Sequence, residues 1–361
     1  MSYQPDKVLY ETLRDDPRIT NPGMKDVATL LARGKLVETP DTRQAITDLI
    51  FFPDDVVDAT DFSYMAGAHR AAEYPEIGDA ILGAMNIKAR AYIMSGGSTL
   101  VDMLDADPIA TEARLMTDYA IMRDAAPEFV VDGPAWLVNP NRYQDVRPAD
   151  QLPEEAKKPE NADELLSEAQ NTVAGLLAAG EPFLVLENQA MHTRMNFDKT
   201  LQLVPQIAEY RNFHIMTSRE HRRRAEMTFR ACLPEGMRDE MNVTFSSYET
   251  PHSLEWDKSF TEELDLVDDH GAVLGEVARW VEYGVKGDLY WGENAPKILQ
   301  LVERAAEVAR SEDHLSDTHL DLADYGDALL MRCREAAGLT DEPAPARATP
   351  AASQEGPAPK A

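Results

Sequence analysis

Short apolar runs alternate with helical patterns in the second half of this chain, and this alternation constrains the fold more than any other feature. Apolar runs at 182–186, 213–216 and 241–246 are separated by helical patterns at 201–210 and 219–232. An apolar run of this length between turn residues is typical of a strand that is buried on both faces. Because helices alternate with these strands, we predict a three-layer α/β domain built on a parallel sheet.

The same region continues into helices and then into a segment of different composition. We expect a fourth strand at 288–291, an amphipathic helix at 296–309 and a last helix at 320–337. Beyond Gly338 the chain is rich in proline and alanine and lacks aromatic residues. Such a composition cannot bury enough apolar surface to fold, so we predict a disordered tail at 339–361.

The first half of the chain contains more helical pattern than strand pattern. Helices are expected at roughly 61–73, 76–85 and 108–125, and strands at 46–52 and 88–94. The second of these strands runs into Ser-Gly-Gly-Ser, a turn that can cradle phosphate but that also serves as an ordinary strand-to-helix turn. These elements predict a mostly helical α+β domain.

A proline-containing segment with scattered charge and little apolar content lies between the two halves. We place the domain boundary in this segment, at 139–164, because such a composition is typical of a linker. The predicted organisation is therefore an α+β domain of unknown role at 1–138, the linker, and the α/β domain at 165–338.

The charge and the cysteines narrow the class of protein. The formal net charge is −29, and nucleic acids and anionic membranes both attract basic rather than acidic surfaces. We therefore do not expect general nucleic-acid or membrane binding. The two cysteines, Cys232 and Cys333, suggest neither a disulfide framework nor a zinc cluster. With no secretion signal and no long apolar run, we expect a cytoplasmic protein.

The segment 212–226 combines a strand pattern with a candidate anion site. Its apolar run ends at Thr217-Ser218, where a helix pattern begins, and helix N-termini attract anions. Arginines follow at once, so the predicted substrate-binding residues are Thr217, Ser218, Arg219, Arg222 and Arg223. The same residues also fit an ordinary helix cap followed by a solvated arginine face that pairs with acids.

Polar groups are expected where three of the strands end, and ligands of parallel sheets gather at that edge. The three groups are Glu187-Asn188-Gln189, Thr217-Ser218 and Gly292-Glu293-Asn294. Two lysines, Lys258 and Lys286, lie between the second and third groups along the chain.

In these features the region 182–307 resembles the haloacid dehalogenase-like phosphatase superfamily. The segment His-Ile-Met-Thr-Ser-Arg at 214–219 is similar to the second motif of the family. The segment at 284–297, Gly-Val-Lys-Gly-Asp-Leu-Tyr-Trp-Gly-Glu-Asn-Ala-Pro-Lys, is similar to its lysine and magnesium-binding run. The resemblance implies a Rossmann-like sheet and a Mg²⁺ ion that helps to bind a phosphorylated small molecule.

The resemblance also implies roles for particular residues. Glu187 and Gln189 stand where the family has two aspartates, and an alternative alignment uses Asp198. Lys258 or Lys286 takes the position of the family lysine. The implied magnesium ligands are Glu187, Glu293 and Asn294. Because the usual aspartate nucleophile is replaced, we expect recognition of phosphate with weak or no hydrolase activity.

A second candidate site lies in the first half of the chain. His69 and Glu73 are four residues apart on one face of an expected helix, and Glu112 opens a later helix. Two helical ligands with a distant acid resemble a zinc hydrolase site, although the second histidine of that motif is absent. A surface His–Glu pair without a metal explains the same spacing.

Three hypotheses about function remain. The first is a phosphate- or nucleotide-recognising domain that is catalytically degenerate. The second is a non-catalytic scaffold whose acidic surface and tail contact protein partners. The third is a remnant of a zinc-dependent hydrolase.

Overall fold

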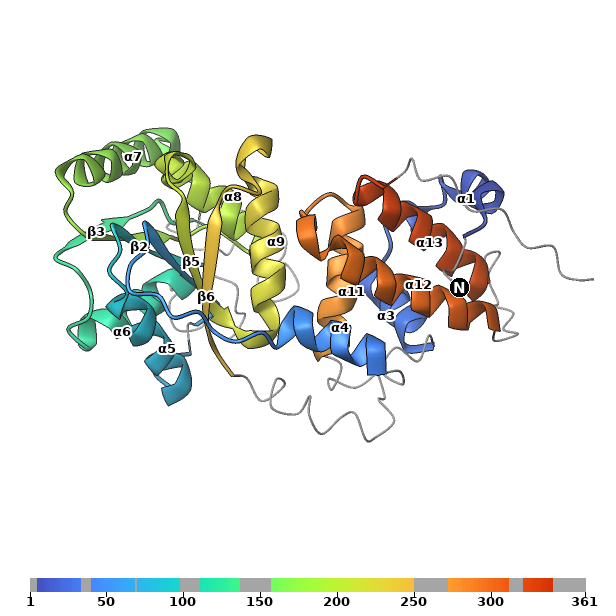
Figure 1. Ribbon diagram of the computed structural model, residues 1–361. Helices are drawn as coiled ribbons and strands as arrows, with labels where there is room; N and C mark the ends of the chain where they lie inside the picture. Colours follow the sequence, from blue (N-terminus) through green and yellow to red (C-terminus); the bar gives the residue numbers. More distant parts are fainter. Residues whose placement is uncertain are drawn as a thin grey trace, which may run out of the picture.

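The computed structural model describes residues 5–33, 40–68, 70–97, 111–136, 157–249, 272–311 and 321–339. These residues form a part that contains a sheet and a part that contains only helices (Figure 1). Within them, no helix combines the length and the apolar character needed to cross a membrane.

The sheet has six parallel strands among the described residues. Their order across the sheet is β3-β4-β2-β1-β5-β6. The strands are β1 (Phe62–Ala66), β2 (Ala91–Ser95), β3 (Phe129–Asp132), β4 (Phe183–Glu187), β5 (Asn212–Ser218) and β6 (Asn242–Tyr248). The predicted α/β class with a parallel sheet is confirmed.

Helices cover both faces of the sheet, because the central strands are apolar on both sides. One face packs against α7 (Ala162–Ala179), α8 (Thr193–Leu203) and α9 (Arg222–Cys232), with Phe197 and Phe229 among the buried contacts. The other face packs against α5 (Pro75–Asn86) and α6 (Glu112–Met122). This gives the three layers that the alternation of strands and helices predicts.

The helical part is built from both ends of the described chain. Its buried residues form a single apolar core. Its helices are α1 (Lys7–Leu13), α2 (Pro17–Thr20), α3 (Met24–Arg33), α4 (Pro40–Ile50), α11 (Ala272–Val285), α12 (Ala295–Ser311) and α13 (Leu322–Ala336). Short 3-10 helices lie at Pro205–Glu209, Arg219–His221, Glu235–Met237 and Gly292–Asn294.

The predicted division of the chain needs correction. Strands β1 to β3 come from 1–138, yet they form one sheet with β4 to β6 from 165–338. The helices of 7–50 share a core with those of 272–336 instead. The segment 139–164 therefore does not separate two cores. Local composition could not show this, because the pairing of β1 with β5 joins residues far apart in the chain.

Several predicted elements are confirmed and three are wrong. The predicted helix at 61–73 contains strand β1, and the predicted strand at 46–52 lies largely in helix α4. The segment 288–291, expected as a fourth strand, joins no sheet. Short apolar runs fit a buried helix face as well as a strand, which explains these errors. Predictions for 137–156, 250–271 and 340–361 lie outside the described residues.

Buried ion pairs and hydrogen bonds connect the two parts. The guanidinium of Arg224 on α9 lies 2.6 Å from the carboxylate of Glu276 on α11. Burial raises the pKa of Glu276, but Arg224 and its neighbours outweigh this and lower it to about 2. The amide of Tyr290 also donates to the carbonyl of Met227, at 2.9 Å. The helical part is thus held against α9 by an ion pair and a backbone hydrogen bond.

Two glycines of α11 give a test of the packing in the helical part. A Cβ at Gly284 would overlap the indole of Trp291, whose Nε1 donates to the carbonyl of Trp280, whereas a Cβ at Gly275 would meet no atom within 4 Å. We expect Gly284→Ala to lower the free energy of unfolding by about 1–3 kcal/mol through overpacking. Gly275→Ala should raise it by about 0.5–1 kcal/mol. Urea denaturation measures both, and equal effects would contradict this packing.

Candidate functional site

The carboxyl ends of the six parallel strands meet at one edge of the sheet. The loop after β1 turns toward α5 on one face, whereas the loop after β5 turns toward α9 on the other face. β1 and β5 are neighbours, so the two loops diverge and leave a switch point between them. Open α/β sheets bind ligands at such a point.

Glycines bring the backbone of the β1 and β2 loops close to this edge. Gly67 has φ 74° and is exposed, and Gly96 has φ 147°, both values that side-chain-bearing residues rarely adopt. A Cβ at Gly96 would lie 2.7 Å from Glu112 Cβ, and one at Gly97 would lie 2.7 Å from the carbonyl of Ala190. The Ser-Gly-Gly turn noted in the sequence is therefore required by close approach.

Glu187 lies at the end of β4 and is only 2% exposed. Its carboxyl group accepts hydrogen bonds from the amides of Gln189 and Ala190, at 2.7 and 3.1 Å, and from the hydroxyl of Ser95, at 2.9 Å. Burial raises the pKa of Glu187 to about 7, although these hydrogen bonds and Lys199 act in the opposite direction. Near neutral pH this buried group is therefore partly protonated.

A hydrogen-bonded chain fixes the ends of β3 and β4 to the start of α6. The side-chain Nδ2 of Asn188 donates to the carboxylate of Asp132 at 2.7 Å and to the carbonyl of Gly133 at 2.9 Å. Thr111 donates to the Asn188 side chain at 2.6 Å and caps α6 by accepting from the amide of Arg114. These buried contacts leave little freedom for the first residue of α6, Glu112.

The buried Nε2 of Gln189 has no hydrogen-bond partner among the described residues, whereas the buried hydroxyl of Tyr64 lies beside the side chains of Ser95 and Asn196. Tyr64 is 1% exposed and Gln189 is 8% exposed. Burial raises the pKa of Tyr64, although Ser95 and Asn196 lie close enough to oppose the shift. An unpaired buried donor such as Nε2 of Gln189 costs about 1–3 kcal/mol of stability.

The hydroxyls of Thr217 and Tyr248 lie at the end of β1. Tyr248 donates to the carbonyl of Gly67 at 2.7 Å. A Cβ at Gly67 would lie 3.5 Å from the Tyr248 hydroxyl and 3.8 Å from Oγ1 of Thr217. Thr217 thus lies next to the end of β1, at the switch point; its predicted role in substrate binding stays a prediction.

The structure does not bring Glu187 and Thr217 into contact. Their strands, β4 and β5, are separated by β2 and β1. Three strand spacings place the two chains roughly 14 Å apart. The resemblance to the phosphatases implies that both side chains contact one phosphate. At this separation a single phosphate cannot touch both.

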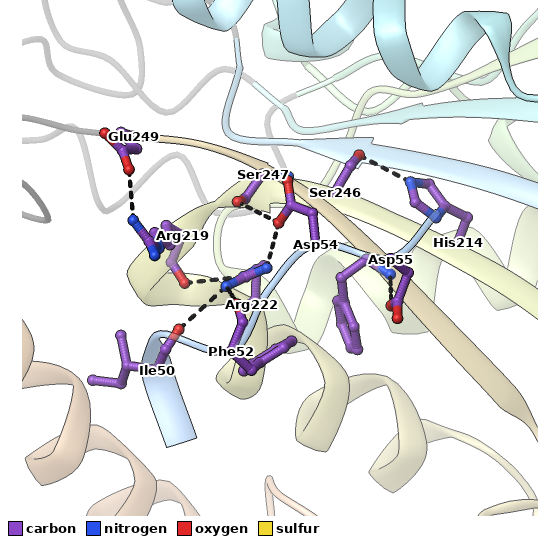
Figure 2. Close-up of polar contacts among 11 residues, drawn as sticks. Ile50, Phe52, Asp54, Asp55, His214, Arg219, Arg222, Ser246, Ser247 and Glu249 are labelled. Carbon is purple, nitrogen blue, oxygen red and sulfur yellow. Dashed lines mark hydrogen bonds and ion pairs between the residues drawn. The ribbon is translucent and has the colours of Figure 1, made fainter. Parts of the chain in front are cut away.

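The arginines predicted to bind substrate are engaged in structural contacts instead (Figure 2). Arg222 is fully buried, so the solvated-face interpretation also fails for it. Its guanidinium pairs with Asp54 and donates to the carbonyls of Ile50 and Phe52. Burial lowers the pKa of Arg222 to about 10, against the opposing effect of Asp54.

The flanking arginines have partners of the same kind. Arg219 pairs with Glu249, and Arg223 pairs with Glu226 and donates to the carbonyl of Leu49 at 3.3 Å. Anion binding by these three arginines would have to replace existing partners.

Asp54 and Asp55 protect the outer edge of the sheet. The carboxylate of Asp55 accepts from the amide of Phe245 at 2.8 Å, and that of Asp54 accepts from the amide of Ser247 at 3.0 Å. These amides lie on β6, at one end of the strand order. Unpaired edge amides recruit other strands, so this arrangement blocks edge-to-edge pairing.

The remaining predicted residues are scattered. Asp198 pairs with Arg194 on α8, and Lys286 pairs with Glu282 on α11. Glu293 and Asn294 form a 3-10 turn before α12 in the helical part, so they do not join Glu187 in a magnesium site. Lys258 lies outside the described residues.

The zinc hypothesis is not supported by contacts. Glu73 pairs with Arg70 at 2.6 Å, and His69 lies outside the described residues. Glu112 lies instead at the carboxyl edge of β2, beside Gly96. Within the described part of the chain, no three His, Cys, Asp or Glu side chains are placed to hold a metal ion.

Sequence reasoning missed part of this edge. It did not place Ser95, Tyr64 and Glu112 at this edge, because their common location depends on β1 and β2 lying at the centre of the sheet. The signal available was the Ser-Gly-Gly turn directly after an apolar run, which the sequence shows at 95–97.

Comparison with known proteins gives no match: no family model, curated protein or solved structure matches the chain. The resemblance to the haloacid dehalogenase-like superfamily therefore rests only on the sequence segments quoted above.

Replacement of Arg222 tests its structural role. In Arg222→Met the carboxylate of Asp54 and two carbonyls lose a buried partner. We expect the free energy of unfolding to fall by about 1–3 kcal/mol in urea denaturation, because the two carbonyls lose their donor while the exposed Asp54 stays hydrated. Arg211→Met is the matched control, because Arg211 pairs with Glu240 at the surface and should cost at most about 0.5 kcal/mol. Equal losses would show that burial of Arg222 contributes nothing.

The raised pKa of Glu187 predicts a pH dependence of stability. Between its ordinary value of 4.5 and about 7, the folded protein keeps a proton that the unfolded chain has released. This contribution to stability is complete below pH 4.5 and is lost as the pH rises through 7. The stability of the wild type should therefore fall relative to Glu187→Gln between about pH 5 and pH 8.

Urea denaturation at several pH values measures this difference. All other titrating groups are common to the two proteins, including buried His214, whose pKa burial lowers to about 4. A difference in unfolding free energy that stays constant with pH would contradict the assignment to Glu187.

Proposed function

We propose that this protein recognises a nucleotide or a related phosphate-bearing small molecule at the carboxyl edge of its sheet. The observation that carries the proposal is the switch point, where the loops after β1 and β5 turn to opposite faces. Nucleotides bind at this position in other open parallel sheets because the diverging loops leave room and expose backbone amides.

The composition of the loops supports a ligand that approaches the backbone. Gly67, Gly96 and Gly97 present no side chain at the ends of β1 and β2. Glycine-bearing turns allow phosphate or ribose to approach backbone N–H groups closely. Thr217 adds a hydroxyl on the β5 side of the same point.

The separation of polar groups favours a ligand longer than phosphate. Glu187 and Thr217 lie on strands that are roughly 14 Å apart by strand spacing. A nucleotide has a base, a sugar and a phosphate, and can therefore contact several strand ends at once.

The hydrogen bonds and the raised pKa of Glu187 fit a residue of a ligand-binding site better than a nucleophile in phosphoryl transfer. Both of its carboxyl oxygens accept hydrogen bonds from neighbouring groups, and its pKa is raised to about 7 by burial. A nucleophile must present a free, ionised oxygen to the phosphorus atom. We therefore infer binding without efficient hydrolysis.

A thermal-stability panel tests the proposal. Adenosine 5′-monophosphate, adenosine 5′-triphosphate and inorganic phosphate are added separately, with and without MgCl₂. A bound ligand at 100 times its Kd stabilises by about 2.7 kcal/mol, which raises the Tm by roughly 5 °C in a chain of this size.

The control for this panel is Thr217→Val, which removes one hydroxyl and keeps the volume of the side chain. It should reduce the shift caused by the nucleotides and leave the Tm without ligand within about 2 °C. If neither the nucleotides nor phosphate change the Tm of the wild type, the proposal is wrong and the scaffold hypothesis gains.

A further inference from the structure

A small cavity lies between α12 and α13, the last two helices of the helical part, which lie side by side in Figure 1. Near Gly326 the two helices pack closely, because a Cβ there would lie 3.1 Å from Cα of Ala306. Toward the end of α13 they leave a cavity of about 180 Å³. Pockets for drug-sized ligands measure about 300–1,000 Å³, so this cavity has the size of a small metabolite.

Apolar side chains form part of the cavity wall. Pro296 and Leu299 come from α12, and Leu330 comes from α13. Leu339 also lines the cavity, because Gly338 takes φ 72° and turns the chain back at the end of α13. The amide of Leu339 fixes this turn by donating to a carbonyl of the last turn of α13, at 2.9 Å. An apolar part of a ligand would lose its contact with water against these residues.

Two opposite charges line the same cavity. Glu303 on α12 and Arg334 on α13 are both half-buried. Oε1 of Glu303 is buried and has no hydrogen-bond partner, and neither side chain has an ion-pair partner within the described part of the chain. Burial raises the pKa of Glu303, and the positive charge of Arg334 opposes this shift. A carboxylate that is partly removed from water without a bonded partner is stabilised by a cation that enters the cavity.

The two charges select for a ligand that carries both signs. A phosphate or a simple acid would pair with Arg334 but would be repelled by Glu303. A simple amine would pair with Glu303 and leave the guanidinium without a partner. A zwitterion satisfies both groups at once, and the volume of about 180 Å³ limits it to a small one.

We propose that this cavity binds a free aliphatic amino acid of about the size of leucine. Its ammonium group donates to the carboxylate of Glu303, and its carboxylate accepts from the guanidinium of Arg334, whose paired N–H groups match a carboxylate. Its side chain lies against Leu299 and Leu330. Each of these residues belongs to the helical part, so the inference is independent of the nucleotide site proposed at the sheet.

Calorimetric titration of the wild type tests the proposal with three probes. L-leucine carries both charges, leucinamide lacks the carboxylate, and 4-methylpentanoate lacks the ammonium group. Loss of a hydrogen bond to a charged group corresponds to a roughly 10- to 100-fold change in Kd. We expect L-leucine to bind, and each analogue to bind more weakly by this factor. Because the wild type itself is titrated, this result does not depend on whether a variant folds.

Two variants assign the charges to their residues. Glu303→Gln should bind L-leucine and 4-methylpentanoate with nearly equal affinity, because the ammonium group no longer has a carboxylate partner. Arg334→Gln should bind L-leucine and leucinamide with nearly equal affinity. The matched control is Glu168→Gln, at an exposed position on α7, which should keep all the preferences of the wild type.

Three outcomes would overturn the proposal. If L-leucine does not bind the wild type, the site is absent. If the two analogues bind as tightly as L-leucine, the cavity accepts apolar molecules without distinguishing their charges. If the variants keep the preferences of the wild type, L-leucine binds elsewhere. Each of these results leaves the nucleotide proposal standing, because that proposal is tested with different ligands.

Discussion

The ion pair between buried Arg222 and the solvent-exposed carboxylate of Asp54 joins the main pieces of this protein. Arg222 opens α9, while Asp54 lies where the chain leaves the helical part and enters the sheet. The same carboxylate accepts from the amide of Ser247 on β6, and Arg222 holds the carbonyl of Phe52. The buried guanidinium needs such partners, since a buried charge left without any costs several kcal/mol. Three segments, α9, residues 52–54 and β6, are therefore held together through this ion pair.

The order of the central strands determines the position of the candidate site. β1 lies between β2 and β5, so the carboxyl ends of these three strands lie at one edge of the sheet, while the helices that follow them lie on opposite faces. The edge is unevenly charged. Glu187 and Glu112 lie on the β4 and β2 side, and Thr217 lies on the β5 side.

The sequence predicted the fold class and several elements for clear physical reasons. The helix Ala162–Ala179 ends at Gly180 because this residue takes φ 74°, which glycine adopts without strain. β4 and β5 were visible as short apolar runs, since strands buried on both faces must be apolar throughout. The same rule failed at 46–52, where an apolar run belongs to the buried face of α4. The candidate site was predicted only in part: Glu187 and Thr217 lie at strand ends, but on strands that are not neighbours.

By itself, the sequence determined the parallel α/β class, the buried strands and the polar residues at their ends, because these depend on local hydrophobic patterns and turn residues. Only the tertiary structure decided which strands are neighbours, which helices share a core and which charges are paired. The arginines of 219–223 show the difference. Their spacing suggested an anion site or a solvated face, yet their partners, Asp54, Glu226 and Glu249, come mostly from segments distant in the chain. A charge pattern gives the position of a cation, but the fold alone determines its partner.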